Sequence, residues 1–324
     1  MAAMIEITDL RKRFGPIVAV DGITFTVDKG EVLGFLGPNG AGKSTTMKVI
    51  SGFLPPTGGT AIVCGHDVTT APLAAKKVIG YLPEGAPGYP DMTPSAFLRF
   101  IAQARGLRGA ERRRRIAHVA EIVHLEGVMR QPIDTLSKGY RRRVGLAQAI
   151  LHDPDVLILD EPTDGLDPNQ KHEVRALIGE MAGRKAIVLS THILEEVEAV
   201  CSRAVVISRG KIVADGTPAD LQARSRYHNA VQLSIKADGA DLDRELNGLE
   251  GVDSVETLDG TGDLTRLRVF ARDGRSIVGE ISRLARSRGW EIDELHVEEG
   301  RLDEVFRSIT EGDLTQHAKR DTNP

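Results

Sequence analysis

The chain has 324 residues, a formal net charge of −4 and a pI near 6.2. This length allows one large domain, or one large and one small domain, and the composition is ordinary for a soluble globular protein. The acidic charge balance gives no reason to expect nucleic acid as a ligand, and no apolar run approaches the ~20 residues that a membrane helix needs. The two cysteines, Cys64 and Cys201, match no metal-binding spacing, so we expect both to be reduced and buried.

The first 225 or so residues alternate short β-type runs with helical patterns, which predicts a layered α/β domain. Several of these runs are apolar throughout, as strands covered on both faces are. The strand candidates include Glu31–Leu36, Val78–Leu82, Val156–Leu159, Ala186–Ser190 and Ala204–Ser208. A helical subdomain is expected over about 84–149, where Thr93 and Pro94 begin a helix as its N-cap and first residue.

The pattern changes after Thr217 and Pro218, and residues 230–310 predict a small α+β domain with the order β-α-β-β-α-β. We expect a turn at Asp259–Gly262 between its second and third strands. The expected strands are Val231–Lys236, Val252–Leu258, Leu264–Ala271 and Glu291–Val297, and the expected helices are Asp241–Leu249, Ser276–Arg288 and Leu302–Ile309. The polar tail over 311–324 is expected to be disordered.

The segment from Gly37 to Ser44 fits the pattern GxxxxGK[ST] at every position, between a strand pattern and a helix pattern. Glycines let main-chain N–H groups approach phosphate oxygens, and the start of a helix adds its positive dipole end. Lys43 is expected to reach the β- and γ-phosphates of a nucleotide, and Ser44 to offer a hydroxyl to Mg²⁺. The expected nucleotide-binding residues here are Gly37, Pro38, Asn39, Gly40, Ala41, Gly42, Lys43, Ser44 and Thr45.

Two carboxylates, Asp160 and Glu161, follow the apolar run Val156–Leu159 and should lie at the carboxyl end of a buried strand. Ligands bind at that edge of open α/β sheets. Asp160 suits the magnesium sphere, and Glu161 suits the general base that polarises the attacking water. His192, which follows the strand pattern Ala186–Ser190, is a candidate partner for the γ-phosphate, although alone it would be an ordinary polar residue at a strand end.

These motifs, in this order, resemble the ABC ATPase family across roughly residues 4–220. Leu136–Tyr140 looks like the signature motif of that family, and Gly165–Pro168 looks like its D-loop, in which Asp167 also reads as a helix N-cap. Phe14 stands where the family keeps an aromatic side chain that stacks on adenine. The alternative interpretation is that Phe14 is an aromatic residue of the core. The resemblance implies a P-loop ABC ATPase fold that binds ATP with Mg²⁺.

The same resemblance implies that ATP lies at a dimer interface, where Lys43, Ser44 and Asp160 of one subunit face Ser137 and Gly139 of the other. One chain carries one P-loop and one signature motif, so a homodimer, or a heterodimer with a related ATPase subunit, is expected. Two departures from the family pattern lie close to this site. Lys138 and Tyr140 alter the signature motif, and Glu84 replaces a glutamine, although its carboxylate can still ligate Mg²⁺.

The altered motifs and the C-terminal extension resemble a branch of export-type ATPases, of gliding-motility and multidrug or antibiotic type, whose permease is a separate chain. The resemblance implies a motor subunit held at the inner, cytoplasmic face of the cell membrane by an integral-membrane permease. Gly85–Phe100 would form part of the docking groove for that permease, or else an uninvolved loop. The N-terminal residues 1–13 have no signal-peptide order. The extension is expected to serve dimerisation or regulation, or to be a packing appendage.

Two other functions compete with this interpretation. A soluble ABC ATPase that acts on ribosomes or DNA would resemble tandem motors or chains with long coiled-coil insertions, and neither occurs in this sequence. A non-catalytic binding subunit is disfavoured because Lys43, Asp160, Glu161 and His192 are all present. We therefore expect an ATPase, with Lys43, Asp160, Glu161 and His192 as its catalytic residues.

Overall fold

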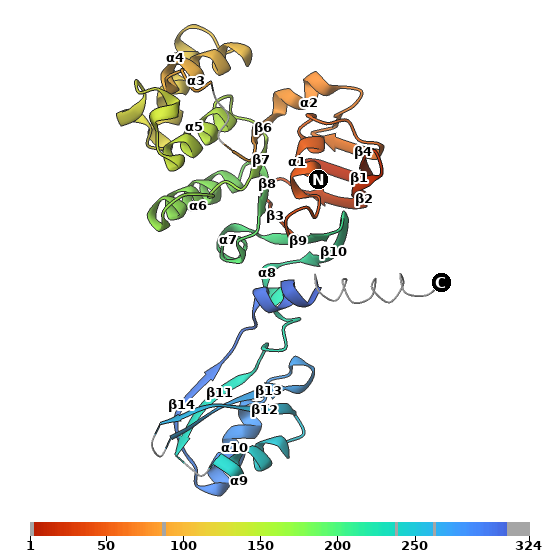
Figure 1. The fold of residues 1–324 in the computed structure, drawn as a ribbon, viewed down its shortest axis with the longest axis vertical. Helices are drawn as coiled ribbons and strands as arrows, with labels where there is room; N and C mark the ends of the chain where they lie inside the picture. Colours follow the sequence, from red (N-terminus) through yellow and green to blue (C-terminus); the bar gives the residue numbers. More distant parts are fainter. Residues whose placement is uncertain (1–2, 86–88, 237–238, 262–263, 310–324) are drawn as a thin grey trace. The chain divides into compact units, whose positions relative to one another are not determined.

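The computed structural model describes residues 3–85, 89–236, 239–261 and 264–309, and the predicted disordered tail lies outside these ranges. The chain divides into two compact units, Met1–Thr217 and Pro218–Pro324 (Figure 1). The first unit is built on a mixed sheet with helices, and the second is a small α+β unit. The predicted fold class is confirmed.

The central sheet of the first unit has six strands in the order β10-β9-β3-β8-β7-β6. Its strands are β3 (Val32–Leu36), β6 (Ile79–Leu82), β7 (Val156–Asp160), β8 (Ala186–Thr191), β9 (Arg203–Ser208) and β10 (Lys211–Gly216). All neighbours pair in parallel except β9 and β10. Every residue of β3, β7 and β8 is buried, which explains why these strands are apolar without alternation. The carboxyl ends of the parallel strands therefore meet at one edge.

A second sheet, with the order β2-β1-β4-β5, is antiparallel and does not appear among the predicted strands. It comprises β1 (Ile5–Phe14), β2 (Ile17–Val27), β4 (Gly58–Val63) and β5 (His66–Asp67). Register shifts break the alternation of β1 near Leu10, so the sequence lacks a regular period-two signal there. One apolar cluster joins this sheet to the central sheet and to α1 (Lys43–Ile50) through Ile7, Phe35 and Met47.

The expected helical subdomain contains α3 (Pro94–Ala104), α4 (Gly109–Ile122) and α5 (Lys138–Ile150) (Figure 1). Thr93 caps α3 as predicted, because its hydroxyl accepts a hydrogen bond from the Ala96 N–H at 3.2 Å. Short 3-10 turns occur at Glu126–Val128 and Ile133–Thr135. The remaining helices of this unit are α2 (Pro72–Val78), α6 (Pro168–Ala182) and α7 (Leu194–Val200).

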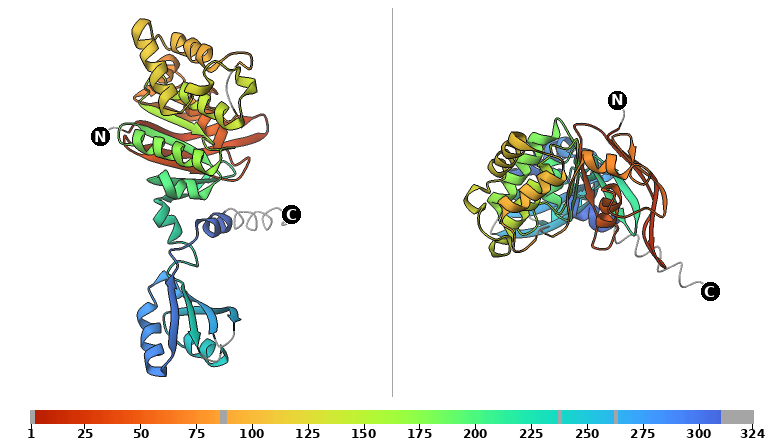
Figure 2. Two further views of the ribbon diagram at one scale, coloured as in Figure 1. Left: turned by 90° about the vertical axis from the view of Figure 1, so that its left-hand side faces the viewer. Right: turned by 90° about the horizontal axis from the view of Figure 1, so that it is seen from above.

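The second unit has the predicted β-α-β-β-α-β order and an antiparallel sheet ordered β12-β13-β11-β14 (Figure 1). Figure 2 gives two further views of the same ribbon. Its elements are α8 (Pro218–Gln222), β11 (Val231–Lys236), α9 (Gly239–Asn247), β12 (Val252–Thr261), β13 (Leu264–Ala271), a 3-10 turn (Arg272–Gly274), α10 (Val278–Arg288) and β14 (Glu291–Val297), and residues 302–309 are helical. The predicted turn at 259–262 starts too early, because β12 continues to Thr261; Gly262 lies outside the described residues.

Both cysteines are free, as expected. Burial raises the pKa of the Cys201 thiol to about 12. The expectation of burial is wrong for Cys64, which is only half-buried because it follows β4 in a turn. Within the described ranges, no helix combines the length and apolar character needed to cross a membrane.

Gly80 permits the close packing of α5 on β6. A Cβ atom at this position would lie 2.2 Å from the Ala149 main-chain oxygen and 2.7 Å from Leu157 Cδ2. Main-chain atoms of a helix cannot yield without moving the helix, so a side chain here would push α5 away from the sheet.

We expect Gly80→Ala to lower the free energy of unfolding by about 1–3 kcal/mol, the usual cost of overpacking. Gly179→Ala is the control, since Gly179 is an exposed residue of α6 with no atom near its added methyl group. That substitution should raise stability by about 0.5–1 kcal/mol because alanine favours a helix. Urea unfolding measures both variants, and equal midpoints for the two would contradict the packing argument.

Candidate functional site

The P-loop connects β3 to α1, and α1 begins at Lys43. Gly42 has φ +113°, and a Cβ atom there would lie 2.4 Å from the Ala19 main-chain oxygen, so only glycine fits. Gly40 has open space around it. Ser44 and Thr45 lie in the first turn of α1 with half-buried side chains. The loop therefore offers main-chain N–H groups at a helix start to a bound anion.

Lys43 is buried, and its ammonium group donates to two carbonyl oxygens of its own loop. Lys43 Nζ lies 2.6 Å from the Gly37 oxygen and 3.2 Å from the Pro38 oxygen. Burial lowers the pKa of Lys43, and the nearby carboxylates of Glu161, Asp160 and Glu84 oppose that shift. An anion in the loop would give this ammonium group stronger acceptors than the two carbonyls.

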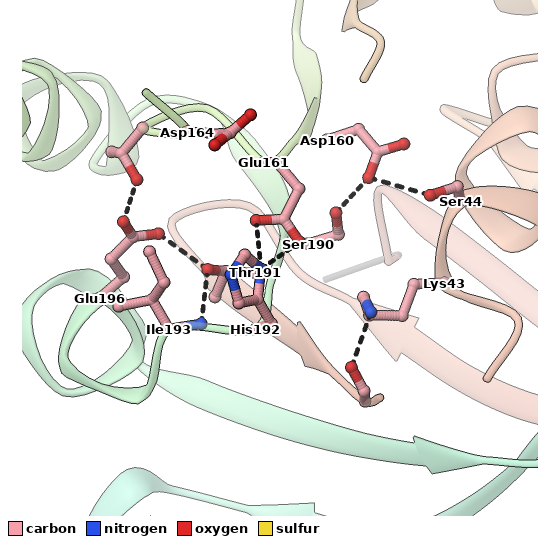
Figure 3. A network of polar contacts seen from close by, with 12 residues as sticks. Lys43, Ser44, Asp160, Glu161, Asp164, Ser190, Thr191, His192, Ile193 and Glu196 are labelled. Carbon is pink, nitrogen blue, oxygen red and sulfur yellow. Dashed lines mark hydrogen bonds and ion pairs between the residues drawn. The ribbon is translucent and has the colours of Figure 1, made fainter. Parts of the chain in front are cut away.

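Asp160 is the last residue of β7, and its carboxylate has no solvent exposure. Its Oδ1 accepts hydrogen bonds from the hydroxyls of Ser190 and Ser44, the latter at 3.4 Å (Figure 3). Its Oδ2 is buried, and no described residue donates a hydrogen bond to it. A buried carboxylate oxygen with no partner is costly, so this atom points to a ligand that the protein itself does not supply.

These donors fit Mg²⁺. Asp160 and Ser44 present hard oxygen atoms side by side, which is the ligand type that Mg²⁺ prefers. Among the described residues there is no cluster of three or more His, Cys, Asp or Glu side chains that could hold a metal unaided. A magnesium ion here would therefore take its other ligands from phosphate and water, as is usual beside nucleotides.

Glu161 and His192 lie against each other (Figure 3). His192 Nδ1 is 2.9 Å from Glu161 Oε1 and 3.0 Å from Oε2, and since a carboxylate accepts, Nδ1 carries the proton of this contact. The main chain of Glu161 has φ +52°, a conformation that costs about 1–3 kcal/mol outside glycine. Its N–H donates to the Ser190 oxygen at 3.0 Å, and its oxygen accepts from the Asp164 N–H at 3.1 Å.

A buried carboxylate on α7, Glu196, links the loop that follows β7 to the last residue of β8. It is 1% exposed and accepts hydrogen bonds from the hydroxyls of Thr163 and Thr191, the latter at 2.9 Å (Figure 3). Burial raises the pKa of Glu196, while the Thr191 hydrogen bond opposes the shift. Neither Glu196 nor Ser190 is among the residues predicted from the sequence, although a polar residue that ends an apolar strand is a detectable signal.

The signature motif lies at the start of α5. Ser137 is exposed and caps the helix by accepting from the Tyr140 N–H at 3.3 Å. Lys138 Nζ pairs with Asp164 Oδ2 of the same chain at 2.9 Å, so its charge is already partnered. Among the contacts of the described residues, none joins Ser137 or Gly139 to the P-loop of the same chain.

The predicted D-loop residue Asp167 caps α6, because its side chain accepts from the Gln170 N–H at 2.9 Å. Phe14 ends β1 and is 45% exposed, with Lys12 Nζ 5.1 Å from its ring centroid, which excludes a core aromatic. Its proposed contact with adenine stays a prediction. Glu84 follows β6 as an exposed residue, and magnesium ligation by its carboxylate also stays a prediction.

A cavity of about 900 Å³ opens between α1, α2 and the helical subdomain. Phe53 and Leu73, both largely exposed, are among its apolar lining residues. The Tyr81 hydroxyl and His152 Nδ1 are buried there without a hydrogen-bond partner among the described residues, and burial lowers the pKa of His152 to about 4. The basic lining residues are Lys48, Lys76, Lys77 and Arg105, and no acidic residue of the described ranges lines the cavity.

Known proteins resemble this chain in sequence and in fold. Residues 20–164 match the family model described as "ABC transporter". The chain is 40% identical over 223 residues to the "Probable multidrug ABC transporter ATP-binding protein YbhF" of Escherichia coli (strain K12), covering 68% of this chain but only 38% of that protein. It is 38% identical over 219 residues to the "Nod factor export ATP-binding protein I" of Ralstonia nicotianae, covering 67% of this chain and 68% of that protein.

Among solved structures, one titled "Structure of ATP binding subunit of ABC transporter" is 34% identical, with a TM-score of 0.63. It covers 68% of this chain and 92% of that structure's chain. The residues matched by the family model include both the P-loop and the acid pair. The chain therefore belongs to the family of ABC transporter ATP-binding proteins, the ABC ATPases.

Proposed function

We propose that the chain is the ATP-hydrolysing motor subunit of an export-type ABC transporter, acting on a separate membrane permease. The observation that carries this proposal is that one edge of the sheet gathers Lys43 and Ser44 of the P-loop with Asp160 and Glu161 (Figure 3). These groups supply anion binding, cation binding and a base within one site.

The chemistry follows from the positions of these side chains. Lys43 and the P-loop N–H groups bind the phosphates, and Ser44 and Asp160 would hold Mg²⁺. When bound, the ion neutralises charge on the phosphate oxygens. Glu161 accepts the proton of the attacking water, and His192 holds its carboxylate through the Nδ1 proton. The strained main chain of Glu161 keeps the carboxylate at the sheet edge.

A second subunit completes the site in this proposal. Ser137 is exposed at the start of α5, where the main-chain N–H groups of a helix can bind an anion. None of its contacts with described residues joins it to the P-loop of its own chain. Each chain offers one P-loop and one signature motif. Two copies, or this chain and a related subunit, would enclose two ATP molecules between them.

We expect Glu161→Gln to retain ATP affinity, to lower the hydrolysis rate by about 10² to 10⁴, and to accumulate as a dimer with ATP and Mg²⁺. The reason is that the amide cannot accept the proton of water, while the binding groups remain. Light scattering after size exclusion and a phosphate-release assay measure both effects. Lys43→Ala, which should bind ATP poorly, is the control that stays monomeric. A Glu161→Gln chain that is monomeric with saturating ATP and Mg²⁺ would count against the composite site.

The transport role is supported by two relatives, one a probable multidrug ABC transporter ATP-binding protein and one a Nod factor export ATP-binding protein. The partner would hold this chain at the inner face of the cell membrane. We place the docking site in the cavity. No described residue of 85–100 lines it, so a part for that segment in docking stays a prediction. The basic and apolar lining of the cavity suits a cytoplasmic segment of the permease that carries acidic and apolar side chains.

The docking proposal predicts the effect of charge reversal. Lys76→Glu with Lys77→Glu should abolish membrane association with the permease and any stimulation of hydrolysis by it, and should leave basal hydrolysis unchanged. Both lysines line the cavity. Arg113→Glu with Arg114→Glu, on the exposed face of α4, is the matched control. Equal co-purification of the two double variants with the permease would exclude this site. Stimulation by ribosomes or DNA instead of a permease would favour a soluble ABC ATPase.

A further inference from the structure

Arg142 connects α5 to two loops of the nucleotide site. It lies in the second turn of α5 and is only 5% exposed. Its Nη1 donates to the Pro83 oxygen at 2.8 Å and to the Gly85 oxygen at 3.1 Å, the two carbonyls on either side of Glu84. One nitrogen thus holds the main chain on both sides of a residue that departs from the family pattern.

The other guanidinium nitrogens reach the loop after β7. Nη2 donates to the main-chain oxygens of Asp160 and Glu161, and Nε donates to the Pro162 oxygen at 3.4 Å. All of these acceptors belong to the main chain. The carboxylates of Asp160 and Glu161 consequently remain available for a cation and for water.

A guanidinium group is suited to this arrangement, because its planar fork of N–H donors can serve several fixed carbonyls at once. A buried cation is costly, and burial lowers the pKa of Arg142, while Asp160, Asp164, Glu161 and Glu84 attract its charge. The cost is offset only while the carbonyls and carboxylates stay around it. This dependence ties the two loops to α5.

The conformation of Glu161 gives these contacts a catalytic consequence. Its left-handed main chain is held at the N–H by Ser190 and at the carbonyl by Arg142 and Asp164. A residue in a strained conformation persists only where its surroundings hold it at several points. Without the Arg142 contacts, Glu161 loses one of the groups that hold its carbonyl.

We propose that Arg142 is a positioning residue for ATP hydrolysis, which fixes the main chain of Glu161 and of the residues around Glu84 so that both move with α5. The inference rests on the proposed hydrolytic step and needs no permease. A failure of membrane coupling would therefore leave it intact.

Replacing Arg142 by Gln or by Lys tests the inference on the purified full chain. Both variants should lower kcat by about 10- to 100-fold with ATP affinity unchanged, because a shift of the base by about 1 Å is enough for such a loss. Lysine keeps the charge but has no fork, so it should not rescue kcat. Recovery of kcat in Arg142→Lys would overturn the inference, since it would show that charge alone is required.

Arg143→Gln is the matched control. Arg143 is also buried on α5, but its Nη2 pairs with Glu173 at 2.7 Å and its Nη1 donates to the Val123 oxygen at 3.2 Å, away from both loops. Arg143→Gln should lower the melting temperature with little change in kcat per folded molecule. Equal losses of kcat in Arg142→Gln and Arg143→Gln at equal losses of stability would assign Arg142 to folding alone and overturn the inference.

A double-mutant cycle separates positioning from any independent effect. In a Glu161→Gln background, Arg142→Gln should lower the rate much less than it does in the wild-type background, because the base that it positions is already disabled. Fully additive losses would overturn the inference. Should Arg142→Gln fail to fold, Arg142→Lys carries the same cycle, and wild-type kcat in a folded Arg142→Lys chain would refute the role.

Discussion

The site is organised around one buried carboxylate, that of Asp160 at the end of β7. Asp160 has no exposed surface, and hydrogen bonds from described residues, Ser190 and Ser44, reach only one of its two oxygens. A buried charge is tolerated where hydrogen bonds or a counter-charge compensate its lost hydration. Two cations within electrostatic reach, Lys43 and Arg142, come from α1 and α5. The site is thus arranged around an anionic strand end, one oxygen of which has no hydrogen-bond partner among the described residues.

The chemistry of the site was predictable from sequence where local motifs encode it. Lys43 and Ser44 belong to a contiguous loop pattern, and Asp160 and Glu161 follow an apolar strand. Arg142 was not predictable, because it is the middle member of three consecutive arginines, two of them buried, and nothing local distinguishes the one that reaches the nucleotide-site loops. Its role depends on carbonyl groups that the tertiary fold brings from the loops after β6 and β7. Glu196 was not predictable for the same reason, because only the packing of α7 brings it to Thr163.

The fold shows the same division. Strands buried on both faces, such as β3 and β7, were predicted because a short, continuous apolar run is typical of a strand in the middle of a covered sheet. The order of the second unit was predicted from strands and helices separated by turn residues. The antiparallel sheet of β1, β2, β4 and β5 was missed, since shifts of register around Leu10 and charged residues such as Arg11 obscure its alternation. Irregular strand pairing leaves no period-two pattern of apolar residues in the sequence, so such a sheet is recognised only from the structure.

The ammonium group of Lys43 already donates to the carbonyls of Gly37 and Pro38 in the folded chain. This lysine is 6% exposed, so its charge is already largely withdrawn from water in the folded chain, before any nucleotide binds. Entry of a triphosphate exchanges neutral acceptors for anionic ones around an ammonium group that is already in place. After the product leaves, the ammonium group can donate to the same two carbonyls again. Each turnover can then begin from an ordered loop, with no step in which the lysine must be recovered from bulk water.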